Sequence, residues 1–171
     1  MTLWLTGFSG AGKSTLAHEV ELRLIESGHA CYTLDGDNVR HGLSSDLGFS
    51  ERDRHENVRR VAEVAKLFND AGMIVVVALI SPYRSDRAVA RALVGPDRFL
   101  EIHVCTALDV CEQRDRKGVY ARARAGDLPG FTGISAPREP PVDPALALDS
   151  AALDVEACAD RVIALIASRL C

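Results

Sequence analysis

Residues 7–14 have the composition and spacing of a phosphate-binding loop. Their sequence, Gly-Phe-Ser-Gly-Ala-Gly-Lys-Ser, matches the pattern G-x-x-x-x-G-K-[ST]. The glycines let backbone N–H groups turn toward phosphate oxygens, while Lys13 can reach the β- and γ-phosphates and the Ser14 hydroxyl can bind Mg²⁺. The alternative is a glycine-rich turn with a solvated lysine. An apolar run before the loop and a helical pattern after it favour nucleoside-triphosphate binding.

Two aspartates follow the second predicted strand, in the segment 34–42. In an extended chain Asp35 and Asp37 point to the same side. Carboxylates at the carboxyl end of a central strand lie near the phosphate loop in an open α/β sheet. One carboxylate can hold Mg²⁺ through water while the other accepts a proton from an attacking hydroxyl. The alternative is an Asp-Gly-Asp-Asn turn selected for its loop chemistry.

The elements that must position these residues alternate between strands and helices. This order predicts a doubly wound, three-layer α/β fold with a mostly parallel five-stranded sheet and helices on both faces. The continuously apolar run 74–80 is typical of a strand buried on both faces. Gly28 and Gly72 end two helices, and Ser50 with Asp53 resembles a capping box. The predicted strands are 3–6, 31–34, 74–80, 99–105 and 146–148, and the predicted helices are 14–27, 51–71, 86–94, 108–115 and 155–170.

The segment 116–144 differs from the rest of the chain, because it is basic at its start and then rich in glycine and proline. It is predicted to be a long ordered loop, and loops of that length in compact domains are usually lids or binding loops. No repeat or interdomain linker is visible. A length of 171 residues with 47% hydrophobic content suits a single domain spanning residues 1–171.

Composition limits the classes of partner and compartment. The net charge of −4 argues against a nucleic-acid binder that works by bulk electrostatics. The five cysteines show no C-x-x-C spacing and are odd in number, which predicts reduced thiols in a cytoplasmic protein. The longest apolar run, 73–80, is too short to cross a bilayer, and no signal peptide is visible. No membrane partner is therefore expected.

Several longer motifs together resemble adenylylsulfate kinases. The segment 34–43, Leu-Asp-Gly-Asp-Asn-Val-Arg-His-Gly-Leu, is one of them, and the motifs keep the family's order from the first strand to the last helix. The resemblance implies transfer of the ATP γ-phosphate to the 3′-hydroxyl of adenosine 5′-phosphosulfate (APS). The product would be 3′-phosphoadenosine 5′-phosphosulfate (PAPS) in sulfate assimilation, with Mg²⁺ as cofactor. The other motifs are 7–15, 47–50, 54–68, 80–84, 117–120 and 123–134.

The resemblance also implies roles for individual residues. Phe49 and Phe131 would stack on the two faces of the APS adenine, and Lys117 would neutralise charge on the transferring phosphoryl group. The implied metal-binding residues are Ser14 and Asp35. The implied ATP-binding residues are Gly10, Ala11, Gly12, Lys13, Ser14, Thr15, Arg114 and Leu153. The implied substrate-binding residues, around a substrate loop 35–57, are Asp37, Asn38, Arg40, Phe49, Arg54, Asn57, Ile80, Ser81, Lys117, Gly130 and Phe131.

Two catalytic assignments have alternatives. We favour Asp37 as the base, with Asp35 serving the metal through water, but the sequence also allows the reverse. In this family the serine matching Ser81 is sometimes described as a phosphorylated intermediate. In-line phosphoryl transfer needs no covalent step, so we interpret Ser81 chiefly as a substrate contact. The catalytic set implied by the resemblance is Lys13, Asp35, Asp37, Ser81 and Lys117. Closure of the lid over these residues would exclude water.

Rival functions share only part of the pattern. A kinase for shikimate or gluconate would share the loop and the aspartates, but would not need the two phenylalanines or the Arg54–Asn57 pair. A GTPase switch would need Asn/Thr-Lys-x-Asp, which none of the three lysines provides. A catalytically dead binding module is disfavoured because every candidate catalytic group is present. The family suggests a homodimer. Because some relatives are fused to an ATP sulfurylase, the chain is either the kinase part of a larger polypeptide or a kinase with a short natural start.

Overall fold

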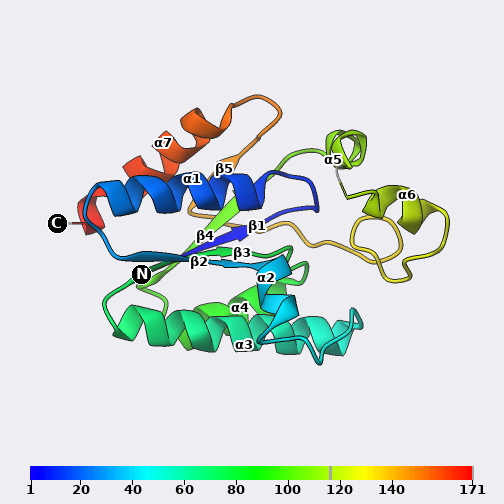
Figure 1. The fold of residues 1–171 in the computed structure, drawn as a ribbon, viewed down its shortest axis with the longest axis horizontal. Coiled ribbons are helices and arrows are strands. Elements are labelled where there is room, and N and C mark those ends of the chain that lie inside the picture. The colour runs from blue at the N-terminus through cyan, green and yellow to red at the C-terminus, as the bar shows by residue number, and fades with distance from the viewer. Residues whose placement is uncertain (116, 171) are drawn as a thin grey trace.

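The computed structural model describes residues 1–115 and 117–170, and in them a five-stranded parallel sheet lies between two layers of helices (Figure 1). The strands are β1 (Thr2–Thr6), β2 (Cys31–Asp35), β3 (Ile74–Ala78), β4 (Phe99–Val104) and β5 (Leu146–Leu148). Their order is β2-β3-β1-β4-β5, and every neighbouring pair is parallel. The predicted fold class is confirmed.

The helices divide between the two faces of the sheet, as Figure 1 shows. Helices α1 (Lys13–Glu26) and α7 (Val155–Ile166) cover one face, and α3 (Glu51–Asp70) and α4 (Arg84–Val94) cover the other. Three short helices, α2 (Gly36–His41), α5 (Leu108–Arg114) and α6 (Val119–Arg124), follow the carboxyl ends of strands or lie beyond them. A 3₁₀ turn, Ala167–Arg169, follows α7 where one continuous helix was predicted. Among the described residues, no helix is long and apolar enough to span a membrane.

The hydrophobic core is split in two by the sheet. Leu3 and Leu5 of β1 face the layer of α1 and α7, whereas Trp4 between them faces α3 and α4 and packs on Phe99 with ring centroids 5.5 Å apart. All five residues of β3 are buried. This burial on both sides explains the continuous apolar run that predicted the strand, because a central parallel strand has no solvent-facing side.

Two short helices, α2 and α6, were not predicted. Helix α6 lies inside the segment 116–144, so the expectation of a lid made only of loop was wrong; residue 116 itself lies outside the described residues. The Asp115 carboxylate accepts hydrogen bonds from the backbone N–H groups of Tyr120 and Ala121, which satisfies donors at the start of α6. A helix of six residues is too short to produce an amphipathic period that could be detected in the sequence.

The predicted capping box of α3 is half formed. The Ser50 hydroxyl accepts from the Asp53 N–H at 3.1 Å, as expected. The Asp53 carboxylate does not return to Ser50 but accepts from the Gly48 N–H at 3.1 Å. The cap therefore fixes the loop before α3, which carries Phe49, as well as the helix itself.

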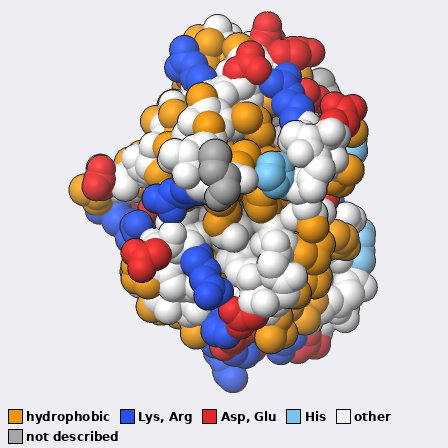
Figure 2. Space-filling model, turned by 90° about the vertical axis from the view of Figure 1, so that its left-hand side faces the viewer, with side chains coloured by type: hydrophobic (Ala, Val, Ile, Leu, Met, Phe, Trp, Pro, Cys, Tyr) orange, Lys and Arg blue, Asp and Glu red, His pale blue; other side chains and the backbone are white. Residues whose placement is uncertain are grey.

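Charges are mixed on the edge of the molecule opposite the carboxyl ends of the strands. Figure 2 shows basic and acidic side chains interspersed there with apolar ones. The opposite edge, at the right of Figure 1, carries α5, α6 and the loop between β1 and α1. The carboxyl ends of the strands, where open α/β sheets bind their ligands, lie on that second edge (Figure 1).

Candidate active site

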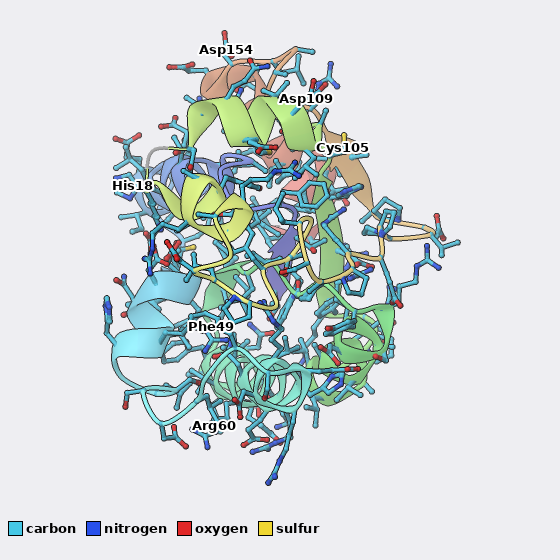
Figure 3. The ribbon with its side chains drawn as sticks, turned by 90° about the vertical axis from the view of Figure 1, so that its right-hand side faces the viewer. His18, Phe49, Arg60, Cys105, Asp109 and Asp154 are labelled. Carbon is cyan, nitrogen blue, oxygen red and sulfur yellow. The ribbon has the colours of Figure 1, made fainter. Side chains whose placement is uncertain are left out.

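A cavity of about 580 Å³ opens at the carboxyl edge of the sheet and gathers most of the predicted site residues. Figure 3 faces this edge, and Phe49 lies there between α3 and the lid segment. Four predicted residues, Ala11, Asn38, Gly130 and Phe131, do not line the cavity. Those that do are Gly10, Gly12, Lys13, Ser14, Thr15, Asp35, Asp37, Arg40, Phe49, Arg54, Asn57, Ile80, Ser81, Arg114, Lys117 and Leu153.

The phosphate loop winds around its own lysine. The Lys13 ammonium donates to the carbonyl oxygens of Gly7 at 3.1 Å and Phe8 at 2.6 Å. Gly12 precedes α1 with φ of +92°, and a Cβ on Gly7 would stand 2.5 Å from the Val104 carbonyl oxygen, so both positions need glycine. Burial lowers the pKa of Lys13 to about 8. The loop thus holds a desolvated ammonium beside the N-terminus of α1, where an anionic phosphate would bind.

Contrary to the prediction, the two aspartates do not both lie in an extended chain, although both line the cavity beside the phosphate loop. Asp35 caps α2 instead: its Oδ1 accepts from the Asp37 N–H at 2.9 Å, and Asp37 falls in the first turn of the helix. Because of this cap, the two carboxylates lie in different environments. Among the described residues, the buried Oδ2 of Asp35 has no hydrogen-bond partner, whereas Asp37 is exposed to the cavity and forms an ion pair with Lys117.

The segment predicted to be a lid contacts both the phosphate loop and Asp37. Lys117 reaches Asp37 across 80 positions of sequence. The Tyr120 hydroxyl in α6 donates to the Ser9 carbonyl of the phosphate loop at 2.9 Å. Tyr120 is buried and meets Phe131 edge to face, with ring centroids 5.1 Å apart. Helix α6 therefore contacts the phosphate loop, while the Phe131 ring packs on Tyr120 and does not line the cavity.

Arginines surround the Phe49 ring. The guanidinium carbon of Arg40 lies 4.3 Å from the ring centroid, and that of Arg54 lies 5.8 Å away. Arg54 also donates to the Phe49 carbonyl at 3.0 Å and to the Gly130 carbonyl at 2.8 Å. Desolvation by burial lowers the pKa of both arginines. Arg54 thus ties together the two segments that carry the predicted stacking rings, Phe49 and Phe131.

Ser81 has an unusual backbone at the end of the β3 segment. Its φ is +37°, a left-handed value that is unfavourable for a residue with a side chain. Its hydroxyl oxygen accepts from the Trp4 indole N–H at 3.1 Å. Because an indole N–H only donates, the Ser81 O–H hydrogen remains free to donate toward the cavity that Ser81 lines. The buried Oδ1 of Asn57, which has no partner among the described residues, lines the same cavity.

A network that sequence reasoning missed joins the phosphate loop to the loop before α7. Arg114 donates to the hydroxyl and carbonyl oxygens of Ser150 at 2.7 and 2.8 Å. The Ser150 hydroxyl in turn lies 2.9 Å from the Ala11 carbonyl. Ala11 itself is buried, and Asn38 is exposed on α2 outside the cavity. A single serine in an irregular loop carries no sequence signal, so only the fold reveals Ser150.

The charges and donors that line the cavity suit anionic ligands and one hard cation. Among residues 1–115 and 117–170, no group of three or more His, Cys, Asp or Glu side chains is arranged to hold a metal by itself. The Oδ2 of Asp35, which has no partner among the described residues, and the Ser14 hydroxyl are hard oxygen atoms on one cavity, and this chemistry fits Mg²⁺ held mainly by phosphates and water. A phosphate loop between β1 and α1, with Lys117 and Tyr120 lining the same cavity, is characteristic of the class of P-loop phosphotransferases.

Comparisons with known proteins place the chain within that class. Residues 1–149 match the family model described as Adenylylsulphate kinase. The adenylyl-sulfate kinase of Prochlorococcus marinus is 56% identical over 161 residues, which cover 94% of this chain and 80% of that protein. That of Geotalea uraniireducens is 55% identical over 169 residues, covering 99% and 81%. A solved Mycobacterium tuberculosis APS kinase, in complex with AMPPNP and APS, superposes with a TM-score of 0.93 at 48% identity and 96% coverage of both chains.

The chain therefore belongs to the adenylylsulphate kinase family, a family of ATP-dependent phosphotransferases. The match agrees with the resemblance inferred from the motifs. It also removes the rival assignments to another small-molecule kinase or to a GTPase switch, because the family match covers both the phosphate loop and the segments that surround Phe49 and Arg54.

Proposed function

We propose that this chain transfers the γ-phosphate of ATP to the 3′-hydroxyl of APS, giving ADP and PAPS in sulfate assimilation. The observation that carries the proposal is a cavity that joins a complete phosphate loop to a second set of polar and aromatic groups around Asp37 and Phe49. A nucleotide donor and a nucleotide acceptor can meet there in line.

The chain's own residues supply the positioning and the charge. Lys13 and the N–H groups at the start of α1 bind the ATP phosphates. Arg114 and Leu153 contact the adenine end of ATP. Asp37 accepts the proton of the attacking 3′-hydroxyl, while Lys117, its ion-pair partner, neutralises charge on the transferring phosphoryl group. The pairing supports these roles, because it keeps the acceptor and the cation on the same side of the cavity.

Mg²⁺ would be held by the Ser14 hydroxyl and, through water, by Asp35. The Oδ2 of Asp35 has no hydrogen-bond partner in residues 1–115 and 117–170, which supports this assignment over the reverse one, in which Asp35 would be the base. When bound, Mg²⁺ neutralises charge on the phosphate oxygens. Asp35 takes no further part, because its other oxygen is committed to capping α2.

Ser81 acts as a donor to the substrate and not as a phosphorylated intermediate. Its oxygen already accepts the Trp4 indole N–H, and its side chain is only 3% exposed. A nucleophile needs a base within reach of its proton, whereas a hydrogen-bond donor needs only the free O–H. The APS side of the cavity is completed by Arg40, Arg54, Asn57 and Ile80. Phe49 stacks on the APS adenine.

We also propose that residues 1–171 form one domain with a phosphate loop at 7–15, a substrate loop at 35–57 and a lid at about 116–144. The lid closes over the reacting groups and excludes water. The family resemblance supports a homodimer, and the reduced state predicted for the cysteines supports a cytoplasmic location. Light scattering coupled to gel filtration tests the dimer directly.

Product analysis tests the function. The enzyme is incubated with ATP and Mg²⁺, together with APS or AMP, and the nucleotides are separated by chromatography. ADP formed only with APS, in equal amount to a 3′-phosphorylated product, is the expected result. ADP formed at the same rate without APS, or with AMP in place of APS, contradicts the proposal. Omission of Mg²⁺ should abolish the transfer.

A further inference from the structure

Arg87 is a buried charged residue that none of the catalytic assignments uses. It projects from the first turn of α4 and is only 3% exposed. Its Nε donates to the Glu101 carboxylate of β4 at 2.5 Å, which compensates the buried charge. Its two terminal nitrogens have different partners: one donates to the Ser81 carbonyl at 2.7 Å and the other to the Glu139 carbonyl at 2.8 Å. One planar group therefore fixes two backbone segments.

The first segment is the strained connection between β3 and α4. With φ of +37°, Ser81 adopts a conformation that a serine holds only when its surroundings impose it. Arg87 donates a hydrogen bond to the Ser81 carbonyl, and the Trp4 indole donates to the Ser81 hydroxyl oxygen. The Thr6 hydroxyl donates to the neighbouring Ile80 carbonyl at 2.7 Å. These donors aim Ser81 at the cavity, where it lies beside Ile80.

The second segment is the carboxyl-terminal root of the lid, residues 139–140. The Glu139 N–H donates to the Pro82 carbonyl at 2.9 Å, and the Glu139 carboxylate accepts from the Arg84 N–H at 2.7 Å. The Arg84 side chain adds a bond to the Pro140 carbonyl at 2.8 Å. The lid root is thus joined to the same connection that carries Ser81, and Arg87 lies behind the junction.

We propose that Arg87 is a positioning residue that fixes Ser81 and the lid root in one geometry. The APS side of the cavity and the closing lid would then share one rigid structural support. The inference rests on the proposed function, because it takes Ser81 as an APS contact. Arg87 touches neither substrate. Its loss should therefore weaken APS binding and admit water to the site. The phosphate loop between β1 and α1 should keep its geometry.

Two substitutions test the proposal. Arg87→Met removes all three contacts, and Arg87→Lys keeps an amine for Glu101 but cannot bridge two carbonyls as well. Arg91→Met is the matched control, since Arg91 stands one turn further along α4, is exposed, and lies outside the cavity. The KM values for APS and for ATP, kcat, and ADP formation without APS are measured, and circular dichroism establishes the temperature range in which each variant is folded.

The expected result is a KM for APS raised about tenfold or more in Arg87→Met, because small misplacements of binding groups are costly. The KM for ATP stays within about twofold, and APS-independent ADP formation rises because the loosened lid admits water. Arg87→Lys falls between Arg87→Met and the unsubstituted enzyme, and Arg91→Met matches the unsubstituted enzyme. Unchanged kinetics in a folded Arg87→Met, or equal rises in both KM values, overturn the proposal.

A separate variant covers the case in which Arg87→Met does not fold. Arg84→Ala removes the exposed contact between Arg84 and Pro140 without opening the core. A raised KM for APS with an unchanged KM for ATP supports the shared structural support, and no change in either KM contradicts it. If the unsubstituted enzyme makes no ADP from ATP and APS, the proposed function fails instead, so the two failures are distinguishable.

Discussion

Replacing Phe49 with alanine should weaken APS binding while sparing both ATP binding and the fold. The Phe49 side chain is 63% exposed, so the folded protein gains little from the ring itself. The ring itself is exposed, and its cation–π contacts with Arg40 and Arg54 contribute about 0.5–1 kcal/mol each. We expect the free energy of unfolding to fall by no more than about 2 kcal/mol, the sum of the two contacts.

The loss in APS affinity should be larger. Stacking of a base on an aromatic ring contributes about 1–3 kcal/mol. Because each 1.4 kcal/mol is a factor of ten, the dissociation constant for APS should rise by roughly 5-fold to 150-fold. Phe49 lies in the loop before α3, whereas ATP phosphates bind at the loop between β1 and α1, so the KM for ATP should stay within about twofold.

Steady-state ADP production, with APS and ATP varied in turn, measures both effects. Leu67→Ala is the control, because Leu67 is an equally exposed apolar residue of α3, at 65%, and does not line the cavity. It should leave both KM values unchanged. Equal weakening of APS and ATP, or an unchanged KM for APS, would refute the stacking role and the reasoning behind it.

Two further results are expected. Asp37→Ala should abolish turnover while leaving the dissociation constant of ATP, measured by calorimetry, nearly unchanged; an active variant would remove Asp37 as the base. ATP affinity should be constant at low pH and weaken as the pH rises through about 8, because burial lowers the pKa of Lys13 to about 8 and the neutral amine no longer attracts phosphate. Calorimetry at pH 8.5 (about half a unit above that pKa) in two buffers of different ionisation enthalpy should show proton uptake on ATP binding, and proton release would contradict the role of Lys13.

Local patterns carried the parts of the fold and the site that were predicted correctly. The continuous apolar run at β3 and the glycine after α1 specify their elements through nearby residues alone. The ends were less accurate: β3 stops at Ala78 rather than at residue 80, and the left-handed backbone of Ser81 follows three residues later. The backbone conformation expected between Asp35 and Asp37 was wrong, because a side-chain cap starts a helix where an extended chain was assumed.

The sequence by itself determined the class of chemistry, since a phosphate loop needs only its own glycines, lysine and serine in order along the chain. The tertiary structure alone decided which distant groups meet. Lys117 pairs with Asp37 across 80 residues, and Arg54 reaches Gly130 across 76. The physical reason is the strand order β2-β3-β1-β4-β5, which places the ends of β1, β2 and β3 at one edge and lets the lid contact all three. No local pattern encodes such contacts, because they depend on how the whole sheet is assembled.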